Sequence, residues 1–418
     1  MTDSVSRRRL LASTGTVLAT GLAGCGYQPA GGELDWRDDA GGSPGFTRTS
    51  DERWLVDDAS LFRIRNRNGR VVEHGTGFVE VEDAYVTVYD SKGTRIWSGA
   101  AETQYAGEPA VADGRAYVPL EDGRVTALER EPATDEWDAG TDVRRRWRTD
   151  WDGADRSLIA DDALVAGVHA DGLVAFDADD GATRFDLGRE AFGGRRIVDV
   201  AVGSGRVWAI GTDEGTDADE SDGTNDDAGG TGADREPVLY GVTADGDVRT
   251  AASIPAPPGW LETSGSTAVV GVDDEILAFF DGDDPAFVVE LEGPTARATP
   301  LVVEERDRLY HYADGTLEAV DVDEGRRVWS RDDYSFREPP VADADGVYGR
   351  GTGPGATDCG LVAITHEGEP WWHVPPLEEL GCAGDLRLVG DRLVVIADGT
   401  LYGFRRRPGR RYTIAHRL

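Results

Sequence analysis

The stretch Leu317-Glu-Ala-Val-Asp321 decides how this sequence is interpreted, because the same five-residue pattern recurs along the chain. The pattern is an apolar residue, any residue, a small residue, an apolar residue and then usually Asp, Glu or Thr. Copies start at Val125, Leu173, Leu239, Ile276, Leu317, Leu361 and Leu401, with a degenerate copy at Val86. Such a recurrence indicates one small structural unit that stacks on its neighbours.

Each repeat contains about four short β-like runs with Asp-Gly or similar turns between them. One or two runs precede each pentad, and a fourth run follows it, often with a tryptophan such as Trp147 or Trp329. Units of about 40 residues with four strands are typical of propeller blades. We therefore expect an all-β protein, a single β-propeller of four-stranded blades. Counting the copy at Val86 predicts eight blades, and seven is the alternative.

Two details of the propeller follow from the same repeats. The run at residues 54–65 lies too close to Val86 to form a blade of its own, so we expect it to close the ring against the last blade. The small third residue of each pentad is expected to leave room for an aromatic side chain from the next blade.

The residues after two of the pentads resemble a known repeat. Asp177 and Gly181 in one copy, and Asp321, Gly325 and Trp329 in another, match the motif Ala-x-Asp-x-x-Thr-Gly-x-x-x-Trp. This tryptophan-docking motif marks the pyrroloquinoline-quinone-like (PQQ-like) β-propeller family, which the chain resembles from about residue 53 to its end. The resemblance implies that the tryptophan docks against a neighbouring blade, where its ring N–H finds an acceptor.

The N-terminal segment, residues 1–25, is predicted to be an export signal. Arg7 and Arg8 belong to a twin-arginine pattern, followed by a mostly apolar run at positions 10–22. That run is shorter than the ~20 residues of a membrane-spanning helix. Leu22-Ala-Gly-Cys25 resembles the lipobox of lipoproteins. We therefore expect twin-arginine export, a lipid on Cys25 and a location on the outer face of the cytoplasmic membrane. One lipid chain binds a membrane only marginally, so a second chain or another contact is implied.

The chain then divides into three parts. Residues 1–25 are the signal, residues 26–52 are predicted to be a flexible tether rich in Gly, Asp and Pro, and residues 53–418 form the propeller. Within the propeller, residues 213–235 are an acidic, Gly-rich insertion predicted to be disordered.

The composition limits the possible partners. Acidic residues number 79 and basic residues 43, which gives a formal net charge of −36. A surface this negative repels phosphate backbones, so no nucleic-acid partner is expected. All the basic residues except Lys92 are arginine. This bias, with abundant Asp, is typical of a halophilic protein in molar salt, where the Debye length falls to ~3 Å.

The sequence predicts no catalytic residue, no metal and no cofactor. Quinone-dependent dehydrogenases resemble this repeat but add a calcium site, an aspartate base and two adjacent cysteines, and no Cys-Cys pair exists here. The six histidines show no metal-ligand spacing. We therefore favour a lipid-anchored binding or scaffolding module for protein or carbohydrate partners. Its layout is similar to that of the lipoprotein propellers that assist outer-membrane protein assembly. The alternative is a quinone-dependent dehydrogenase or redox protein that uses the propeller channel.

Cys359 and Cys382 are the cysteines that remain once Cys25 carries a lipid. An exported protein can form disulfides. Cys359 precedes the third strand of its predicted blade, and Cys382 follows the fourth. In an up-and-down blade, these two connections emerge on the same face. We therefore predict a disulfide between them, with two free thiols as the alternative.

Overall fold

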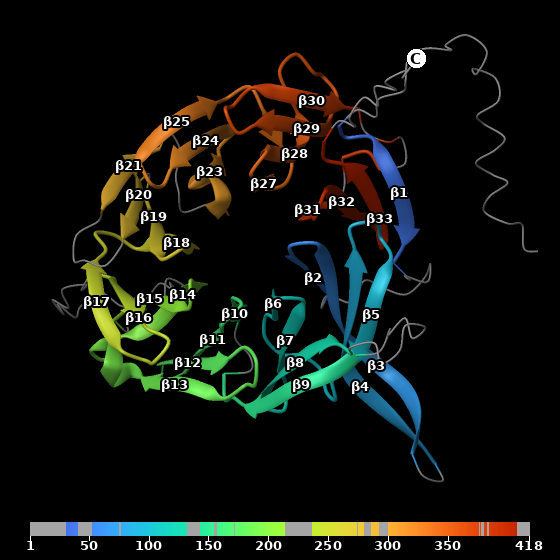
Figure 1. Cartoon of the computed structure of the whole chain (residues 1–418), viewed down its shortest axis with the longest axis vertical. Helices are drawn as coiled ribbons and strands as arrows, with labels where there is room; N and C mark the ends of the chain where they lie inside the picture. Colours follow the sequence, from blue (N-terminus) through green and yellow to red (C-terminus); the bar gives the residue numbers. More distant parts are fainter. Residues whose placement is uncertain are drawn as a thin grey trace, which may run out of the picture.

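The computed structural model describes residues 31–40, 52–74, 77–131, 143–153, 157–170, 172–213, 236–273, 275–279, 286–291, 300–375, 377, 380–382 and 384–407. Over these residues the chain forms eight antiparallel sheets arranged in a ring, so the predicted eight-bladed propeller is confirmed (Figure 1). Two short 3-10 helices, η2 (Arg189–Phe192) and η4 (Glu304–Arg306), join strands. No helix in the described part of the chain is long and apolar enough to cross a membrane.

The blades are numbered here in chain order, and their strands are called a to d from the centre of the ring outward. Blade 1 contains β2 (Glu52–Asp57), β3 (Ser60–His74), β4 (Gly77–Asp90) and β5 (Arg95–Ala100). Blade 2 contains β6 (Ala110–Ala112), β7 (Arg115–Leu120), β8 (Arg124–Arg130) and β9 (Val143–Asp150). Blade 3 contains β10 (Leu158–Ala160), β11 (Leu164–His169), β12 (Gly172–Asp177) and β13 (Thr183–Gly188). Blade 4 contains β14 (Arg196–Gly203), β15 (Arg206–Thr212), β16 (Val238–Val242) and β17 (Val248–Ser253).

The second half of the ring repeats this arrangement. Blade 5 contains β18 (Pro258–Ser264), β19 (Thr267–Val272), β20 (Glu275–Phe279) and β21 (Phe287–Glu290). Blade 6 contains β22 (Leu301–Val303), β23 (Arg308–Ala313), β24 (Thr316–Asp321) and β25 (Arg326–Arg331). Blade 7 contains β26 (Ser335–Phe336), β27 (Val341–Asp343), β28 (Gly346–Thr352), β29 (Gly360–Thr365) and β30 (Pro370–Val374). Blade 8 contains β31 (Asp385–Val389), β32 (Arg392–Ala397), β33 (Thr400–Arg405) and β1 (Leu34–Asp39).

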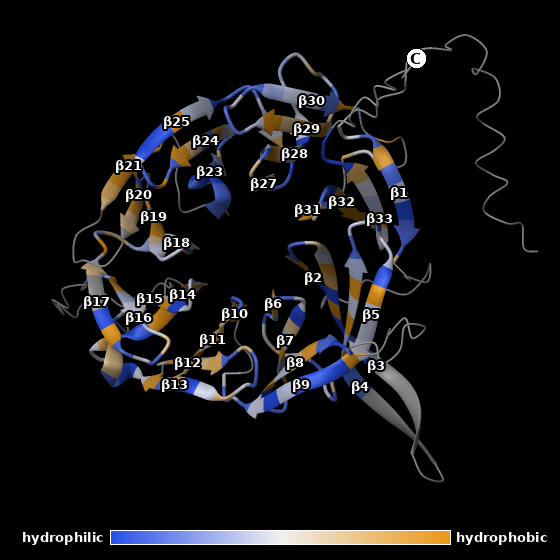
Figure 2. Cartoon of the chain, in the orientation of Figure 1, coloured by the Kyte–Doolittle hydropathy of each residue, from blue (hydrophilic) through white to orange (hydrophobic). Residues whose placement is uncertain are grey.

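Every recurring pentad lies in the c strand of a blade. A c strand is covered on both faces by the neighbouring blades, so successive residues are buried; Leu317, Ala319 and Val320 are fully buried. This double burial explains why the pentad is nearly continuously apolar rather than alternating. Figure 2 shows the contrast with d strands such as β9 and β25, which are largely hydrophilic.

The small third residue of the pentad faces an aromatic ring of its own blade, so the expectation of a ring from the next blade is wrong. Ala319 pairs with Trp329 across β24 and β25, and Gly403 pairs with Trp36 across β33 and β1. A Cβ atom on Gly403 would lie 2.1 Å from the Trp36 ring. The small residue therefore accommodates the outer-strand aromatic that lies directly across the same sheet.

The ring is closed by β1, which differs from the segment predicted to close it. β1 supplies the d strand of blade 8, whose other three strands come from the C-terminal end of the chain. Residues 54–65, predicted to close the ring, instead belong to the a and b strands of blade 1. The predicted tether of residues 26–52 is likewise wrong over β1. The hydrophilic sequence of β1 gave no strand signal because an outer strand has one exposed face.

The two faces of the ring carry different connections, because the strands of each blade alternate in direction. The a–b and c–d turns lie on one face, here called the turn face. The b–c turns and the connections between blades lie on the other, here called the connection face. In blade 1, β3 and β4 are far longer than other b and c strands and extend as a hairpin beyond the ring (Figure 1).

Candidate functional site

The motif residues form the contact that joins one blade to the next. The Trp147 indole N–H, in the d strand of blade 2, donates to the Ala178 carbonyl in the c–d turn of blade 3 at 2.9 Å. Gly181 closes that turn with φ +71°, and a Cβ atom there would lie 2.5 Å from the Trp147 ring. Only glycine therefore satisfies both the backbone conformation and the close approach of the ring.

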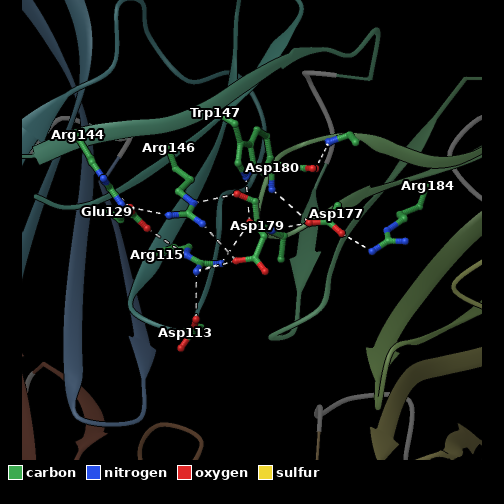
Figure 3. Close-up of polar contacts among 12 residues, drawn as sticks. Asp113, Arg115, Glu129, Arg144, Arg146, Trp147, Asp177, Asp179, Asp180 and Arg184 are labelled. Carbon is green, nitrogen blue, oxygen red and sulfur yellow. Dashed lines mark hydrogen bonds and ion pairs between the residues drawn. The ribbon is translucent and has the colours of Figure 1, made fainter. Parts of the chain in front are cut away.

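Asp177 organises the same turn (Figure 3). Its Oδ1 accepts hydrogen bonds from the backbone N–H groups of Asp179 and Asp180, at 2.8 and 3.2 Å, and its other oxygen pairs with Arg184. Partial burial would raise the pKa of the Asp177 carboxyl, but these hydrogen bonds outweigh it and lower that pKa. The carboxylate therefore acts as a turn-stabilising acceptor.

The second motif copy shows how the repeats interlock. Trp329 does not meet Gly325 of its own repeat; its indole N–H donates to the His366 carbonyl in the c–d turn of blade 7 at 2.9 Å, over Gly368. Gly325 in turn lies against Phe287 of blade 5. Asp321 accepts the Glu324 N–H at 2.8 Å, as Asp177 does in its own turn. In these repeats the aromatic residue of one repeat thus meets the glycine of the next one.

A network of charges surrounds the contact between blades 2 and 3 on the turn face (Figure 3). Arg115 lies 3.3 Å from a Glu129 oxygen and 3.0 Å from an Asp179 oxygen. Arg144 and Arg146 also pair with Glu129. Each of these carboxylates is matched by guanidinium groups, so the network joins the two blades.

The connection face has a groove between blades 6 and 7 with a volume of about 200 Å³. It exists because the inner strand of blade 7 is interrupted: β26 and β27 both pair with β28, and residues 338–340 between them leave the sheet after the Arg337 N–H has donated to the Arg350 carbonyl of β28 at 2.8 Å. Pro339 and Pro340 have no N–H to donate to a strand ladder, which accounts for the interruption. The groove is lined by Leu301, Tyr310, Tyr312, Phe336, Arg337, Glu338, Pro339 and Pro340.

Aromatic packing fixes the floor of this groove. The Tyr312 and Phe336 rings meet edge to face with their centroids 5.0 Å apart. The backbone N–H of Phe336 donates to the Tyr312 hydroxyl at 2.9 Å. Phe336 also stacks on Tyr334 at 6.0 Å. Arg337 and Glu338 are exposed at the rim. The groove therefore offers a rigid apolar floor with one positive and one negative group at its edge.

The connection between blades 7 and 8 is held on the connection face by a disulfide and by hydrogen bonds from a buried arginine. Cys359 and Cys382 form a disulfide, with their Cα atoms 6.1 Å apart. The buried Arg350 guanidinium donates to the carbonyls of Gly384 and Gly381, at 2.7 and 3.0 Å. Burial lowers the pKa of Arg350 from its ordinary value. These bonds hold the connection beside the strand that borders the groove.

Two carboxylates with perturbed acidity lie on the inner strands of blades 4 and 5. Burial, and then repulsion by Asp199, raise the pKa of Glu262 to about 7. Burial also raises the pKa of Asp199, opposed by hydrogen bonds from the Val200 and Leu261 N–H groups. No motif marked this pair in the sequence, because the two residues are brought together only by adjacent blades. Among the described residues, no group of three or more His, Cys, Asp or Glu side chains could hold a metal ion.

Comparison with known proteins agrees with the propeller fold and its repeats. Residues 25–221 match the family model PQQ_2, described as outer membrane protein assembly factor BamB. Over these residues the chain is similar to the PQQ-like β-propeller family. No curated protein matches the sequence significantly.

Solved structures share the propeller fold of this chain at low identity. Sqt1 from Chaetomium thermophilum is 11% identical with a TM-score of 0.50, over 85% of this chain and 95% of that chain. A dihydro-heme d1 dehydrogenase, NirN, solved in complex with DHE, is 14% identical with a TM-score of 0.50, over 90% of this chain and 81% of that chain. BamB from Moraxella catarrhalis is 14% identical with a TM-score of 0.45, over 85% of this chain and 99% of that chain. At these identities the similarity shows the fold alone.

The predicted site residues divide into two groups. Asp177, Gly181, Asp321, Gly325 and Trp329 all lie at contacts between blades or in the turns that support them. The export residues Arg7 and Arg8, the lipidation residue Cys25 and nearly all of the acidic insertion at residues 213–235 lie outside the described residues. The groove was missed, although the Pro339-Pro340 pair, which cannot donate to a strand ladder, was a usable signal for it.

Proposed function

We propose that this protein is an extracytoplasmic, lipid-anchored propeller that binds a protein partner in the groove between blades 6 and 7. The observation that carries the proposal is the aromatic groove, opened on the connection face where two prolines interrupt the inner strand of blade 7. The family model, which describes an assembly factor, supports a role in binding other proteins.

The chemistry of the groove favours an extended protein segment. Aromatic-lined grooves dock extended, proline-rich or apolar segments, which lose little conformational entropy on binding. Here Tyr312 and Phe336 supply the floor, and Arg337 and Glu338 supply polar groups at the rim. A volume of about 200 Å³ is below the roughly 300–1,000 Å³ of small-molecule sites. The groove therefore suits one or two side chains of a partner better than a quinone cofactor.

Site-specific photo-crosslinking in the native cell envelope tests the groove. A photoreactive residue at Glu338 is expected to give a discrete protein adduct. The same residue at Glu324, an exposed glutamate on the turn face of blade 6, is expected to give none and is the matched control. The change Tyr312→Ala should abolish the adduct, whereas Tyr312→Phe should preserve it because the ring remains. Equal adducts from both positions, or an adduct that survives Tyr312→Ala, would refute the groove as the binding site.

The anchor is tested separately. Cys25 follows a lipobox-like stretch and a twin-arginine pattern, so the Cys25→Ser variant should lose its membrane association and appear in the medium. Membrane fractionation equal to that of the native protein would contradict lipid attachment at this residue. Arg7→Lys with Arg8→Lys should block export, detected as retention of precursor inside the cell.

A further inference from the structure

A pocket lies between blades 1 and 2, away from the groove, and is here called the rim pocket. It has a volume of about 200 Å³ and is bounded by β5 and β9, which are outer strands of the ring (Figure 1). Its floor is apolar and is lined by Ala100, Ala101, Leu120, Leu128 and Val143. The rest of the lining is polar and consists of Thr126, Glu102, Arg145 and Arg148. The rim pocket therefore combines a small apolar cavity with two guanidinium groups.

Arg145 and Arg148 both reach the rim pocket because β9 contains a bulge. The pairing of β8 with β9 shifts by one residue between Ala127 and Leu128, which makes Arg146 the extra residue of the outer strand. Side chains three positions apart point to opposite faces of a regular strand. The bulge re-aims one of them, so that both guanidinium groups lie on the face directed toward blade 1.

The equivalent positions of other blades do not carry two arginines. The strand register places there Arg95 and Ser98 in blade 1, Thr183 and Asp186 in blade 3, Arg327 and Ser330 in blade 6, and Pro370 and His373 in blade 7. The repeat therefore does not require the pair, and its presence in blade 2 needs a local explanation.

The carboxylate of Glu102 bridges the two guanidinium groups of the rim pocket. Its Oε1 accepts a hydrogen bond from Arg145 at 2.6 Å, and its Oε2 accepts one from Arg148. These hydrogen bonds, from Arg145 first and then from Arg148, hold the pKa of the Glu102 carboxyl below its ordinary value. The Glu102 side chain is 61% exposed, so it can turn into solvent with little loss of packing. The guanidinium pair thus holds a carboxylate that is free to leave.

The charges around the rim pocket favour a monoanion. Asp122 accepts a hydrogen bond from Arg148 at 2.6 Å, so two positive charges face one negative charge once Glu102 has turned away. A carboxylate restores neutrality, whereas a phosphate dianion would leave an excess of negative charge. The rim pocket is smaller than the roughly 300–1,000 Å³ of drug-sized ligand sites, so the apolar group that fills its floor is short.

We propose that the rim pocket binds a carboxylate carried on a short aliphatic group, and that Glu102 occupies the carboxylate position when no ligand is bound. Arg145 and Arg148 bind the carboxylate oxygens through charge-assisted hydrogen bonds. A free short-chain acid and the C-terminal carboxylate of a protein that ends in a small aliphatic residue share this chemistry. The site is independent of the groove between blades 6 and 7 and of the lipid anchor.

Saturation-transfer NMR on the full mature protein in molar potassium chloride tests the site, with butyrate as the probe. Butyramide has the same shape without the charge and is the control ligand. We expect saturation transfer to the methyl group of butyrate and none to that of butyramide. Glu102→Ala should bind butyrate about tenfold more tightly or better, because it removes a tethered competitor whose effective concentration is on the order of millimolar or higher.

Substitutions in the Glu102→Ala protein locate the binding site. Arg145→Gln should weaken butyrate binding about tenfold or more, because one of the two guanidinium groups is lost. Arg144→Gln is the matched control, since Arg144 is on the same strand, is similarly exposed and pairs with Glu129 instead. Tyr312→Ala, in the groove, should likewise leave butyrate binding unchanged. Circular dichroism checks that each variant is folded.

Competition with the peptide acetyl-Gly-Val, as the free acid and as the amide, identifies the source of the carboxylate. Displacement of butyrate by the free acid alone supports a protein C-terminus as the ligand, and displacement by neither peptide supports a free short-chain acid. Equal transfer to butyrate and butyramide, displacement by both peptides, or binding that Arg145→Gln does not weaken would overturn carboxylate recognition. Butyrate binding unchanged by Glu102→Ala would overturn the role of Glu102. An absence of transfer in both the native and the Glu102→Ala proteins would overturn the site.

Discussion

A glycine and an aromatic ring from neighbouring repeats make the contact that joins one blade to the next. Gly181 under Trp147 and Gly368 under Trp329 are two instances, and in each the indole N–H also reaches a carbonyl of the turn. The glycine serves two purposes, because it adopts positive φ and leaves space for the ring. These two effects can be separated experimentally.

The change Gly181→Ala is expected to destabilise the protein by about 1–3 kcal/mol more than Gly114→Ala. Both glycines have φ +71°, so both variants bear the same backbone strain. A Cβ atom at position 181 would collide with Trp147, whereas one at position 114 would meet nothing within 4 Å. Denaturant unfolding in molar salt measures the difference. Equal losses of stability would mean that the ring contact contributes nothing beyond the strain.

Glu262 is expected to make stability depend on pH. Its folded-state pKa of about 7 lies above the ordinary value of 4.5, so its contribution to stability is complete below about pH 4.5 and is lost as the pH rises through about 7. Glu262→Gln removes this loss. Relative to the native protein, the variant should gain on the order of 3 kcal/mol of folding stability between pH 4 and pH 8.

The control for this change is Glu121→Gln, at an exposed glutamate on the connection face. Its stability should follow that of the native protein across the same range. A constant difference between Glu262→Gln and the native protein from pH 4 to pH 8 would contradict the raised pKa.

At the scale of elements, the ring is closed by a strand with little apolar character. β1 has exposed residues on both sides of Trp36, and this tryptophan makes the main contact with blade 1: its indole N–H donates to the Ser91 carbonyl at 2.9 Å over Gly93. Ion pairs from Asp35 to Arg392 and Arg405 hold β1 within blade 8. This aromatic contact and these ion pairs add to the backbone pairing of β1 with β33.

Replacing Trp36 by Ala is expected to destabilise the protein by about 3 kcal/mol, near the low end for a tryptophan because the ring is only partly buried. The loosened strand should also become a site of early protease cleavage, detected by mass spectrometry of the first fragments. The Trp36→Phe variant keeps a ring over Gly93 and should lose less stability than the alanine variant. Unchanged proteolysis of the alanine variant would show that β1 is held by its backbone pairing alone.

The connection between blades 7 and 8 is stabilised by a disulfide. The disulfide joins cysteines 23 positions apart, and a loop of that size is expected to stabilise the fold by about 3 kcal/mol in the chain-entropy model. Thiol titration of the denatured, unreduced mature protein should therefore find no free thiol at either position. Reduction should lower the unfolding temperature, while the Cys359→Ser, Cys382→Ser variant should be insensitive to reductant. Two reactive thiols before reduction would contradict the bond.

The whole molecule carries far more negative than positive charge. Paired networks such as that around Arg115 and Glu129 use many of the arginines, and the formal net charge of −36 remains. Repulsion among these carboxylates extends over about 10 Å at 0.1 M salt but only ~3 Å in molar salt. Folding is therefore expected to depend on ionic strength.

Circular dichroism should show loss of the β-sheet spectrum as the salt concentration is lowered from molar toward about 0.1 M, with recovery when salt is restored. Potassium and sodium chloride should act alike at equal ionic strength, because the effect is screening. A spectrum that stays constant across the whole range would refute the halophilic interpretation.

The sequence by itself determined the blade type, the blade number and the residues that join the blades. These are local properties: a c strand buried on both faces has an apolar pentad, and a turn that receives an indole ring needs glycine at one fixed position. The position of Cys359 and Cys382 on one face followed from strand alternation alone. Each of these conclusions depends on residues within one repeat or on the regular succession of strands.

Only the tertiary structure decided what depends on residues from distant parts of the chain. The sequence of β1 does not indicate a strand, because its partner β33 lies at the opposite end of the chain and its exposed face removes the apolar signal. The groove required β26, β27 and the Tyr312 side chain of another blade to be placed together. The raised pKa of Glu262 required burial beside Asp199. Burial, ring closure and carboxylate repulsion arise from packing between blades, and no single repeat contains that information.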